Sequence, residues 1–184
     1  MRVIAGKAKR LQLKTPKGLD TRPTSDRIKE TLFNMINPYL NNTMFLDLFS
    51  GSGAIGIEAL SRGAKFATFV DKDRNSINCI KENLITTKLM DTAEIINLDV
   101  VKAINLLESK EVIYDLVFMD PPYNMDIEKE ILVILENSNI INNDSIIIIE
   151  SSIETKFDYI DNMNFQIFKT KEYGSCKHTF IEFK

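Results

Sequence analysis

One segment restricts the possible fold more than any other: an apolar run over residues 44–49 that passes into a glycine turn and then into helical spacing. Gly51 and Gly53 can take backbone angles that a side chain forbids, and they let a ligand approach the main chain. With Gly56 they read G-x-G-x-x-G, and Asp71 follows Gly51 by twenty positions, at the end of the next apolar run. The segment predicts a strand, a turn and a helix that bind a nucleoside, with a carboxylate for its ribose hydroxyls.

A glycine turn of this kind can also do no more than pack a helix against a strand. The strand, the turn, the helix and Asp71 occur together here, and that combination favours ligand binding. A helix that begins near Gly53 would add unpaired N–H groups and the positive end of a helix dipole, which suit an anionic or carboxylate-bearing ligand. Alone, the segment indicates a class of ligand and no reaction.

The remaining chain continues the alternation of strands and helices. Apolar runs predict strands at residues 44–49, 66–70, 93–98, 114–119 and 145–149. Helical spacing predicts helices at residues 24–36, 53–62, 75–87, 100–107 and 127–135, the third with one apolar face made by Ile77, Ile80, Leu84 and Ile85. Strands at 165–170 and 177–183 would form a closing hairpin. This order predicts a doubly wound α/β sheet of seven strands whose last pair is antiparallel.

The first 30 residues carry a charge opposite to that of the rest. They hold nine basic residues against three acidic ones, whereas the whole chain has a formal net charge of −3. This asymmetry indicates a basic arm that contacts phosphates, although a lysine-rich terminus can also be a solvated tail. Short alternating pieces predict that residues 1–19 form a small two-stranded β-ribbon and that residues 20–184 form the main domain.

Composition excludes several classes of protein. With one histidine, His178, and two distant cysteines in 184 residues, a metal cluster or a Ser-His-Asp triad has little to be built from. Cys79 and Cys176 are expected to be reduced thiols. No apolar run approaches the roughly twenty residues of a membrane span, and the first residues are too short in their apolar part for a signal peptide. We expect a cytoplasmic protein without a metal site, and a monomer.

Four aspartates lie toward the carboxyl ends of the predicted parallel strands. Asp47 lies within the first strand, and Asp71, Asp99 and Asp120 come at the ends of the following ones. Ligands of doubly wound sheets lie beyond these carboxyl ends. A single aspartate there can cap a loop, and for Asp99 alone capping is about as good an explanation as binding. Together the four predict one site.

The motif Asp120-Pro-Pro-Tyr123 indicates the reaction. Two prolines fix the backbone and remove two N–H donors, so the loop is stiff and its carbonyls lack internal partners. The Asp120 carboxylate, the Pro121 carbonyl and the Tyr123 ring suit a planar base that bears an amino group. Oxygens that accept both amine hydrogens would free the nitrogen lone pair to attack a sulfonium methyl, without a protein nucleophile. By itself the motif can be a tight surface turn.

In these motifs the chain resembles the S-adenosylmethionine-dependent amino methyltransferases, whose motif is [Asn/Asp/Ser]-Pro-Pro-[Tyr/Phe/Trp]. Within that group it resembles the RsmD family over nearly its whole length. The matching segments are Arg2-Val-Ile-Ala-Gly6, Arg22-Pro-Thr-Ser-Asp-Arg27, Glu30-Thr-Leu-Phe-Asn34, Asp47-Leu-Phe-Ser-Gly-Ser-Gly53, Glu58-Ala-Leu-Ser61 and Asp120-Pro-Pro-Tyr123. The resemblance implies a Rossmann-like methyltransferase domain over residues 20–184 that methylates N2 of one guanine in small-subunit (16S) ribosomal RNA.

The resemblance also implies roles for individual residues. S-adenosylmethionine would be held by Asp47, Ser50, Gly51, Ser52 and Gly53 at its methionine part, by Asp71 at its ribose, and by Asp99 and Val100 at its adenine. The flipped guanine would be held by Asp120, Pro121, Pro122 and Tyr123. The RNA phosphates would be contacted by Arg2, Lys7, Lys9, Arg10 and Arg22.

Other functions stay open at this point. An N6-adenine methyltransferase acting on DNA or RNA would use the same amine motif, although DNA enzymes usually carry a target-recognition domain for which 184 residues leave no room. A nicotinamide dehydrogenase explains the glycines and Asp71 but gives no role to Asp120-Pro-Pro-Tyr123. A non-catalytic RNA-binding module would not need to bind a cofactor. We expect an assembled small ribosomal subunit as substrate, because the basic arm is short and a preorganised ribonucleoprotein would supply much of the recognition surface.

Overall fold

A seven-stranded sheet forms the centre of the molecule, and the computed structural model describes it through residues 1–16, 26–122 and 126–184. The strands are β1 (Met44–Leu48), β2 (Phe66–Val70), β3 (Ala93–Ile96), β4 (Leu116–Met119), β5 (Ile146–Ser152), β6 (Phe165–Tyr173) and β7 (Cys176–Phe183). The helices are α1 (Asp26–Ile36), α2 (Ala54–Arg62), α3 (Arg74–Thr87), α4 (Val100–Glu108) and α5 (Ile127–Glu136). Short 3₁₀ helices are η1 (Asn37–Tyr39), η2 (Met90–Thr92) and η3 (Asp158–Asn162).

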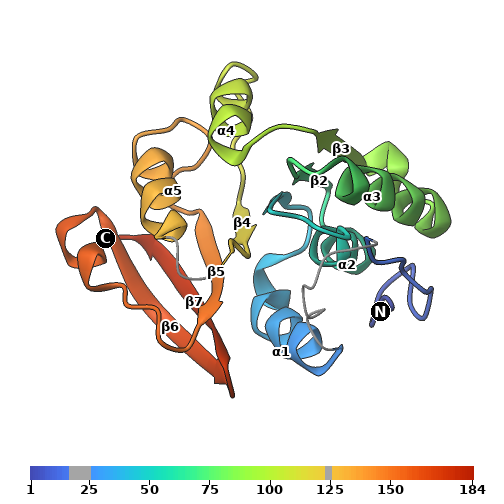
Figure 1. Ribbon diagram of the computed structural model, residues 1–184, viewed down its shortest axis with the longest axis horizontal. Helices are drawn as coiled ribbons and strands as arrows, with labels where there is room; N and C mark the ends of the chain where they lie inside the picture. The colour runs from blue at the N-terminus through green and yellow to red at the C-terminus, as the bar shows by residue number, and fades with distance from the viewer. Residues whose placement is uncertain (17–25, 123–125) are drawn as a thin grey trace.

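The strand order is β3-β2-β1-β4-β5-β7-β6 (Figure 1). The first five strands in this order are parallel, and β7 is antiparallel to both β5 and β6. The predicted doubly wound sheet with an antiparallel closing pair is therefore confirmed. The order reverses between β1 and β4, and ligands of such sheets bind at this switch point.

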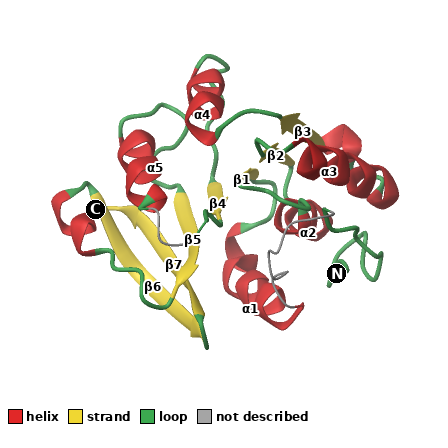
Figure 2. Cartoon of the chain, viewed as in Figure 1, coloured by secondary structure: helices red, strands yellow, loops and turns green. Residues whose placement is uncertain are grey.

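Helices cover both faces of the sheet, with α1 and α2 on one side and α4 and α5 on the other (Figure 2). Side chains of a strand alternate between faces, so Phe45 packs with the α1, α2 and α3 side chains while Leu46 packs with those of α4 and α5. Asp47 is the next residue on the face of Phe45. The Asp47 carboxylate thus points toward α2, the helix that follows the glycine turn.

Two aspartates cap helices at the carboxyl edge of the sheet, Asp73 on α3 and Asp99 on α4. Asp73 accepts a hydrogen bond from the Ser76 N–H at 3.1 Å.

One side-chain expectation on α3 is wrong: Ile77, Ile80 and Leu84 are buried, but Ile85 is 66 % exposed. Successive residues of a helix are rotated by about 100°, so the position after Leu84 turns away from the buried face.

The first 13 residues fold back on themselves beside α2. The expected two-stranded ribbon is reduced to one antiparallel bridge, between Arg2 and Gln12. The ladder stops there because the next N–H groups of the first arm, those of Ile4 and Ala5, donate to the Glu58 carboxylate of α2 instead. The Lys7 N–H then donates to the Ser61 carbonyl of α2 at 2.8 Å. Residues 1–13 are called the N-terminal hairpin below. Their side chains Val3, Ala8 and Leu13 are buried in the same core as those of α1, α2 and α3. The domain boundary predicted at residue 19 lies outside the described residues and stays a prediction.

No helix in the described part of the chain is both long and apolar enough to cross a membrane. Cys79 and Cys176 are both buried, and neither forms a disulfide. The chain termini lie on opposite sides of the molecule, the N-terminus beside α2 and the C-terminus near α5 (Figure 1).

Candidate active site

The glycine turn is tied to the two strands beside it by Asp47 and Ser50. Asp47 is buried, and its Oδ2 accepts a hydrogen bond from the Gly56 N–H in the first turn of α2 at 2.9 Å. The Ser50 hydroxyl donates to the Asp47 carbonyl at 2.6 Å and accepts from the Val70 N–H at 3.0 Å. These bonds fix the turn between β1 and α2 to the end of β2.

Asp71 comes directly after β2 and holds the other side of the turn. Its Oδ2 accepts from the Gly51 N–H and its Oδ1 from the Asp73 N–H, both at 2.8 Å. The loop after β3 joins the same cluster, because the Asn97 side-chain amide donates to the Asp71 carbonyl at 3.0 Å. The predicted cofactor residues from Asp47 to Asp71 are therefore brought together.

The glycines of the turn have different reasons to be glycine. Gly51 has a φ of +54°, and a Cβ built on it would meet nothing within 4 Å. Its backbone angle favours glycine, and the space beside it is open to a ligand. Gly56 is the opposite case, because a Cβ there would lie 2.3 Å from the Phe69 ring. The third glycine of the motif thus serves the packing of α2 on β2.

Burial raises the pKa of the Asp47 carboxyl to about 7. The hydrogen bond from Gly56 lowers the pKa and the nearby charge of Asp71 raises it, but burial is the largest cause. Near neutral pH, the Asp47 carboxyl is therefore close to the midpoint of its titration. Its charge would respond to a cationic group placed at the turn.

The predicted adenine-binding pair, Asp99 and Val100, lies at the start of α4. Asp99 is exposed, and its Oδ1 accepts from the Val101 N–H at 3.1 Å, as a helix cap does. Val100 is buried against the core on the α4 side. β3 ends at Ile96, two residues earlier than predicted. The geometry accounts for Asp99 as a cap, and a contact with adenine stays a prediction.

The amine motif follows β4 on the same edge of the sheet. Asp120 is half-buried, Pro121 is buried and Pro122 is exposed, while Tyr123 lies outside the described residues. Burial raises the pKa of Asp120 well above its usual value, and the charges of Glu150 and Asp47 raise it further. Asp47 is the register partner of Phe118, two residues before Asp120, so the glycine turn and the amine motif lie at the same edge of neighbouring strands.

Comparison with known proteins identifies the family. A family model described as Conserved hypothetical protein 95 matches residues 1–182. Ribosomal RNA small subunit methyltransferase D of Haemophilus influenzae is 37 % identical over 180 residues, which cover 95 % of this chain and 89 % of the relative. The Escherichia coli protein of the same name is 36 % identical over 154 residues, covering 84 % and 76 %. The chain belongs to the RsmD family.

Solved structures agree with this assignment. The candidate methyltransferase yhhF from Escherichia coli superimposes with a TM-score of 0.86 at 33 % identity, covering 100 % of this chain and 98 % of that one. A hypothetical protein from Thermus thermophilus gives a TM-score of 0.84 at 28 % identity, with 99 % of each chain covered. The expected Rossmann-like methyltransferase fold is confirmed for this RsmD-family chain.

Four of the five basic residues predicted to contact RNA lie on the N-terminal hairpin. Lys7, Lys9 and Arg10 are exposed there. Arg2 is also exposed, but its Nε pairs with the Asp26 carboxylate at 3.0 Å. Arg22 lies outside the described residues. Their contact with RNA stays a prediction.

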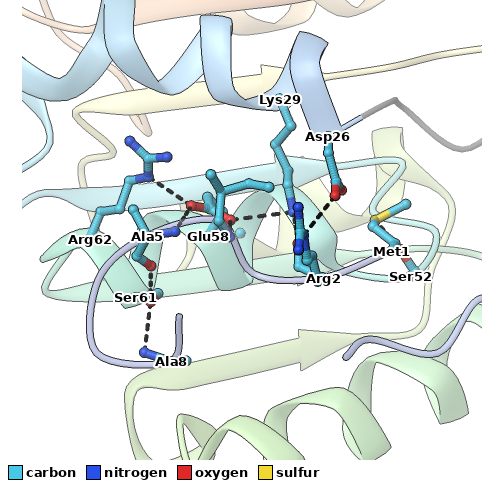
Figure 3. Close-up of polar contacts among 12 residues, drawn as sticks. Met1, Arg2, Ala5, Ala8, Asp26, Lys29, Ser52, Glu58, Ser61 and Arg62 are labelled. Carbon is cyan, nitrogen blue, oxygen red and sulfur yellow. Dashed lines mark hydrogen bonds and ion pairs between the residues drawn. The ribbon is translucent and has the colours of Figure 1, made fainter. Parts of the chain in front are cut away.

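Sequence reasoning missed a buried charge network that holds the hairpin (Figure 3). Glu58 of α2 is fully buried and accepts hydrogen bonds from the Ile4 and Ala5 N–H groups at 2.8 and 3.0 Å. It also pairs with Arg62 at 2.7 Å and with the buried ammonium of Lys29 at 3.3 Å. Burial lowers the pKa of Lys29, and the charge of Glu58 opposes this. The i, i+4 spacing of Glu58 and Arg62 was the only local signal.

Asn83 was missed as well. It is buried on α3, and its Oδ1 accepts from the Lys14 N–H at 2.8 Å. Its amide donates to the Lys14 carbonyl at 3.0 Å and to the Ser52 carbonyl at 2.9 Å. One side chain therefore joins the end of the N-terminal hairpin to the glycine turn. An asparagine inside a helical pattern gives no such signal in the sequence.

Proposed function

We propose that this RsmD-family chain transfers the methyl group of S-adenosylmethionine to the exocyclic N2 amine of a guanine in small-subunit ribosomal RNA. The observation that carries the proposal is the juxtaposition of the glycine turn and Asp120 at one edge of the sheet, where Asp47 raises the pKa of Asp120. The names of the relatives, ribosomal RNA small subunit methyltransferase D, support RNA as the substrate.

The described residues fit S-adenosylmethionine. Each carboxylate oxygen of Asp71 accepts one backbone hydrogen bond and keeps lone pairs for ribose hydroxyls. The space beside Gly51 is open, and α2 directs its N-terminus toward the turn, which suits the carboxylate of the methionine part. When bound, S-adenosylmethionine supplies an electrophilic methyl group on sulfur. Asp99 and Val100 as adenine contacts are part of this proposal.

The chain's own residues would prepare the acceptor amine. Asp120 and the Pro121 carbonyl accept the two hydrogens of N2, which frees the nitrogen lone pair. On methylation the amine would become more acidic and would lose a proton. The raised pKa of Asp120 suits it to take that proton. Tyr123 would stack on the base, and the two prolines would keep the loop stiff.

A labelled-methyl assay tests the reaction. Small ribosomal subunits that lack their native methylations are incubated with the protein and S-adenosylmethionine, and the product nucleosides are analysed. We expect N2-methylguanosine confined to the small-subunit RNA. N6-methyladenosine would keep the amine chemistry but overturn the guanine substrate. Tight cofactor binding without any transfer would overturn the enzymatic function.

We also propose that the assembled subunit is the substrate, because the N-terminal hairpin offers few exposed cations for binding RNA alone: Lys7, Lys9 and Arg10, besides the paired Arg2. The test compares kcat/KM on intact subunits and on the same RNA after removal of its proteins. Subunits are expected to react at least ten-fold faster. Equal rates on both would contradict this part of the proposal.

A further inference from the structure

A buried polar pair crosses the sheet next to Asp120. Glu150 of β5 and His178 of β7 are cross-strand partners, and the His178 Nε2 lies 3.0 Å from the Glu150 Oε2. The imidazole is fully buried and the carboxylate nearly so. The rings of Phe118 and Tyr173 both meet the His178 ring edge-on. Burying a charged group costs several kcal/mol, and apolar residues of similar volume often stabilise a fold at least equally. A role in function therefore explains this buried pair better than a role in stability.

The pair belongs to the same row of the sheet as the amine motif. Met119 of β4 and Ile149 of β5 are partners in parallel register. Asp120, which directly follows β4, and Glu150, which lies within β5, are therefore at the same level of the sheet. Side chains alternate along a strand. Asp120 and Glu150 therefore share the face of Phe118, the face that α1 and α2 cover.

Electrostatics places the two carboxyl groups close together. After burial itself, Glu150 is the largest influence that raises the pKa of Asp120, ahead of Asp47. Two carboxylates with this mutual repulsion are stabilised by a ligand that offers hydrogen-bond donors to both. The Watson–Crick edge of guanine does so, because its N1–H lies beside its N2 amine.

Building on the proposed function, we propose that Glu150 selects guanine by accepting a hydrogen bond from N1–H of the target base, and that His178 positions the Glu150 carboxylate. Among the described residues, only His178 bonds to this carboxylate, through Oε2, which leaves Oε1 for the base. Adenine presents a lone pair at N1, which a carboxylate repels. Glu150 would therefore decide between guanine N2 and adenine N6, which Asp120 and Pro121 treat alike.

The hydrogen bonding of His178 fits a positioning role. Its Nδ1 is buried without a partner among the described residues. An unpaired buried acceptor costs less than an unpaired buried N–H, so the proton is assigned to Nε2, from which it is donated to Glu150. This bond holds the carboxylate in one rotamer and leaves His178 away from the reacting atoms.

The test swaps donor and acceptor between the side chain at position 150 and N1 of the target base. The target guanine in reconstituted small subunits is replaced by 2-aminopurine, which keeps the N2 amine but has a bare acceptor at N1. We expect Glu150→Gln to lower kcat/KM on guanine by about 10²-fold and to leave that on 2-aminopurine unchanged or raised, because the glutamine amide can donate to N1. An equal loss on both substrates would overturn the proposal, since a purely structural defect does not distinguish them.

Matched variants separate positioning from folding. His178→Phe should lower kcat/KM on guanine by about ten-fold with little effect on 2-aminopurine, and should add nothing to Glu150→Gln. The control Glu172→Gln, at an exposed carboxylate on β6, should leave both substrates unchanged. If Glu150→Gln does not fold, Glu150→Asp is measured in the same way; a loss confined to guanine supports the proposal and an equal loss contradicts it. A wild-type protein that makes no N2-methylguanosine would instead refute the proposed function itself.

Discussion

The two halves of the carboxyl edge of the sheet differ in how their polar groups are satisfied. Around β1, β2 and β3, the side chains of Ser50, Asp71 and Asn83 bond to the protein backbone. Around β4, β5 and β7, Asp120 accepts no hydrogen bond from the described residues, and the charge of Glu150 raises its pKa. Hydrogen bonds within the protein thus fix the first half before any ligand binds. In the second half, which we call strained, burial and the charge of Glu150 make the ionised form of Asp120 unfavourable.

This difference matches two kinds of binding. A preformed turn positions a cofactor at little entropic cost. The half-buried Asp120 and the buried Glu150 are instead stabilised as anions only when a ligand donates hydrogen bonds to both. The binding of the base and the preparation of its amine would then be the same event. The cofactor half is thus expected to tolerate loss of the acceptor half, and the following variants test that independence.

The largest effect is expected for Asp120→Ala. Turnover should fall by at least about 10³-fold, because the amine loses its acceptor, while the dissociation constant for S-adenosylmethionine should stay within about three-fold. The variant should also unfold at a higher temperature, since a strained carboxyl is removed. Methyl-transfer kinetics, calorimetric titration and thermal unfolding measure these three quantities. Asp144→Ala, at an exposed aspartate, is the control. A large loss of cofactor affinity would show that the two halves are not independent.

The second prediction concerns the buried network under the N-terminal hairpin. Glu58→Gln leaves the fully buried Lys29 without its counter-ion, and the free energy of unfolding should fall by about 3–5 kcal/mol. Glu82→Gln breaks a lysine pair as well, but that pair with Lys14 is exposed and screened by solvent, so the loss should be much smaller than in Glu58→Gln. Chemical denaturation of both variants gives the comparison. Similar losses would mean that burial does not strengthen the Glu58 pair.

The elements that sequence reasoning found are those with a local signature. The glycine turn, Asp71 and Asp120-Pro-Pro-Tyr123 all stand next to apolar runs, and the alternation of strands and helices predicted the fold class. Element ends were less accurate: β3 is shorter than expected, and β6 continues to Tyr173.

The missed features depend on contacts between distant parts of the chain. Glu58 is read as a surface position of a helix until the hairpin, 53 or 54 residues earlier, covers it. Glu150 and His178 are 28 residues apart and meet only through the register of β5 and β7. Hydrophobic periodicity records which face is apolar, but it does not show which polar residue on that face has a partner.

The third prediction uses the raised pKa of Asp47. The folded-state pKa is about 7, whereas an unfolded aspartate titrates near about 3.9. The folded state therefore binds the proton more tightly, and this group's stabilising effect is complete below the unfolded pKa and is lost as the pH rises through 7. Relative to Asp47→Asn, the wild-type protein should lose at most about 4 kcal/mol between pH 4 and pH 8. Denaturation across this range measures the difference; parallel curves would contradict it.

The smallest effect is expected for Asp71→Ala, which changes the cofactor half of the sheet edge. The carboxylate serves both as a proposed ribose acceptor and as the partner of the Gly51 and Asp73 N–H groups, so its loss removes ligand contacts and loosens the turn together. The dissociation constant for S-adenosylmethionine should rise by about 10–100-fold, corresponding to roughly 1.4–2.8 kcal/mol, while kcat at saturating cofactor should change by less than about five-fold. Asp73→Ala, which removes only the α3 cap, separates loosening of this edge from the ligand contact. If kcat fell as far as in Asp120→Ala, the glycine turn would take part in the chemical step, and the division of the edge into a preformed half and a strained half would be wrong.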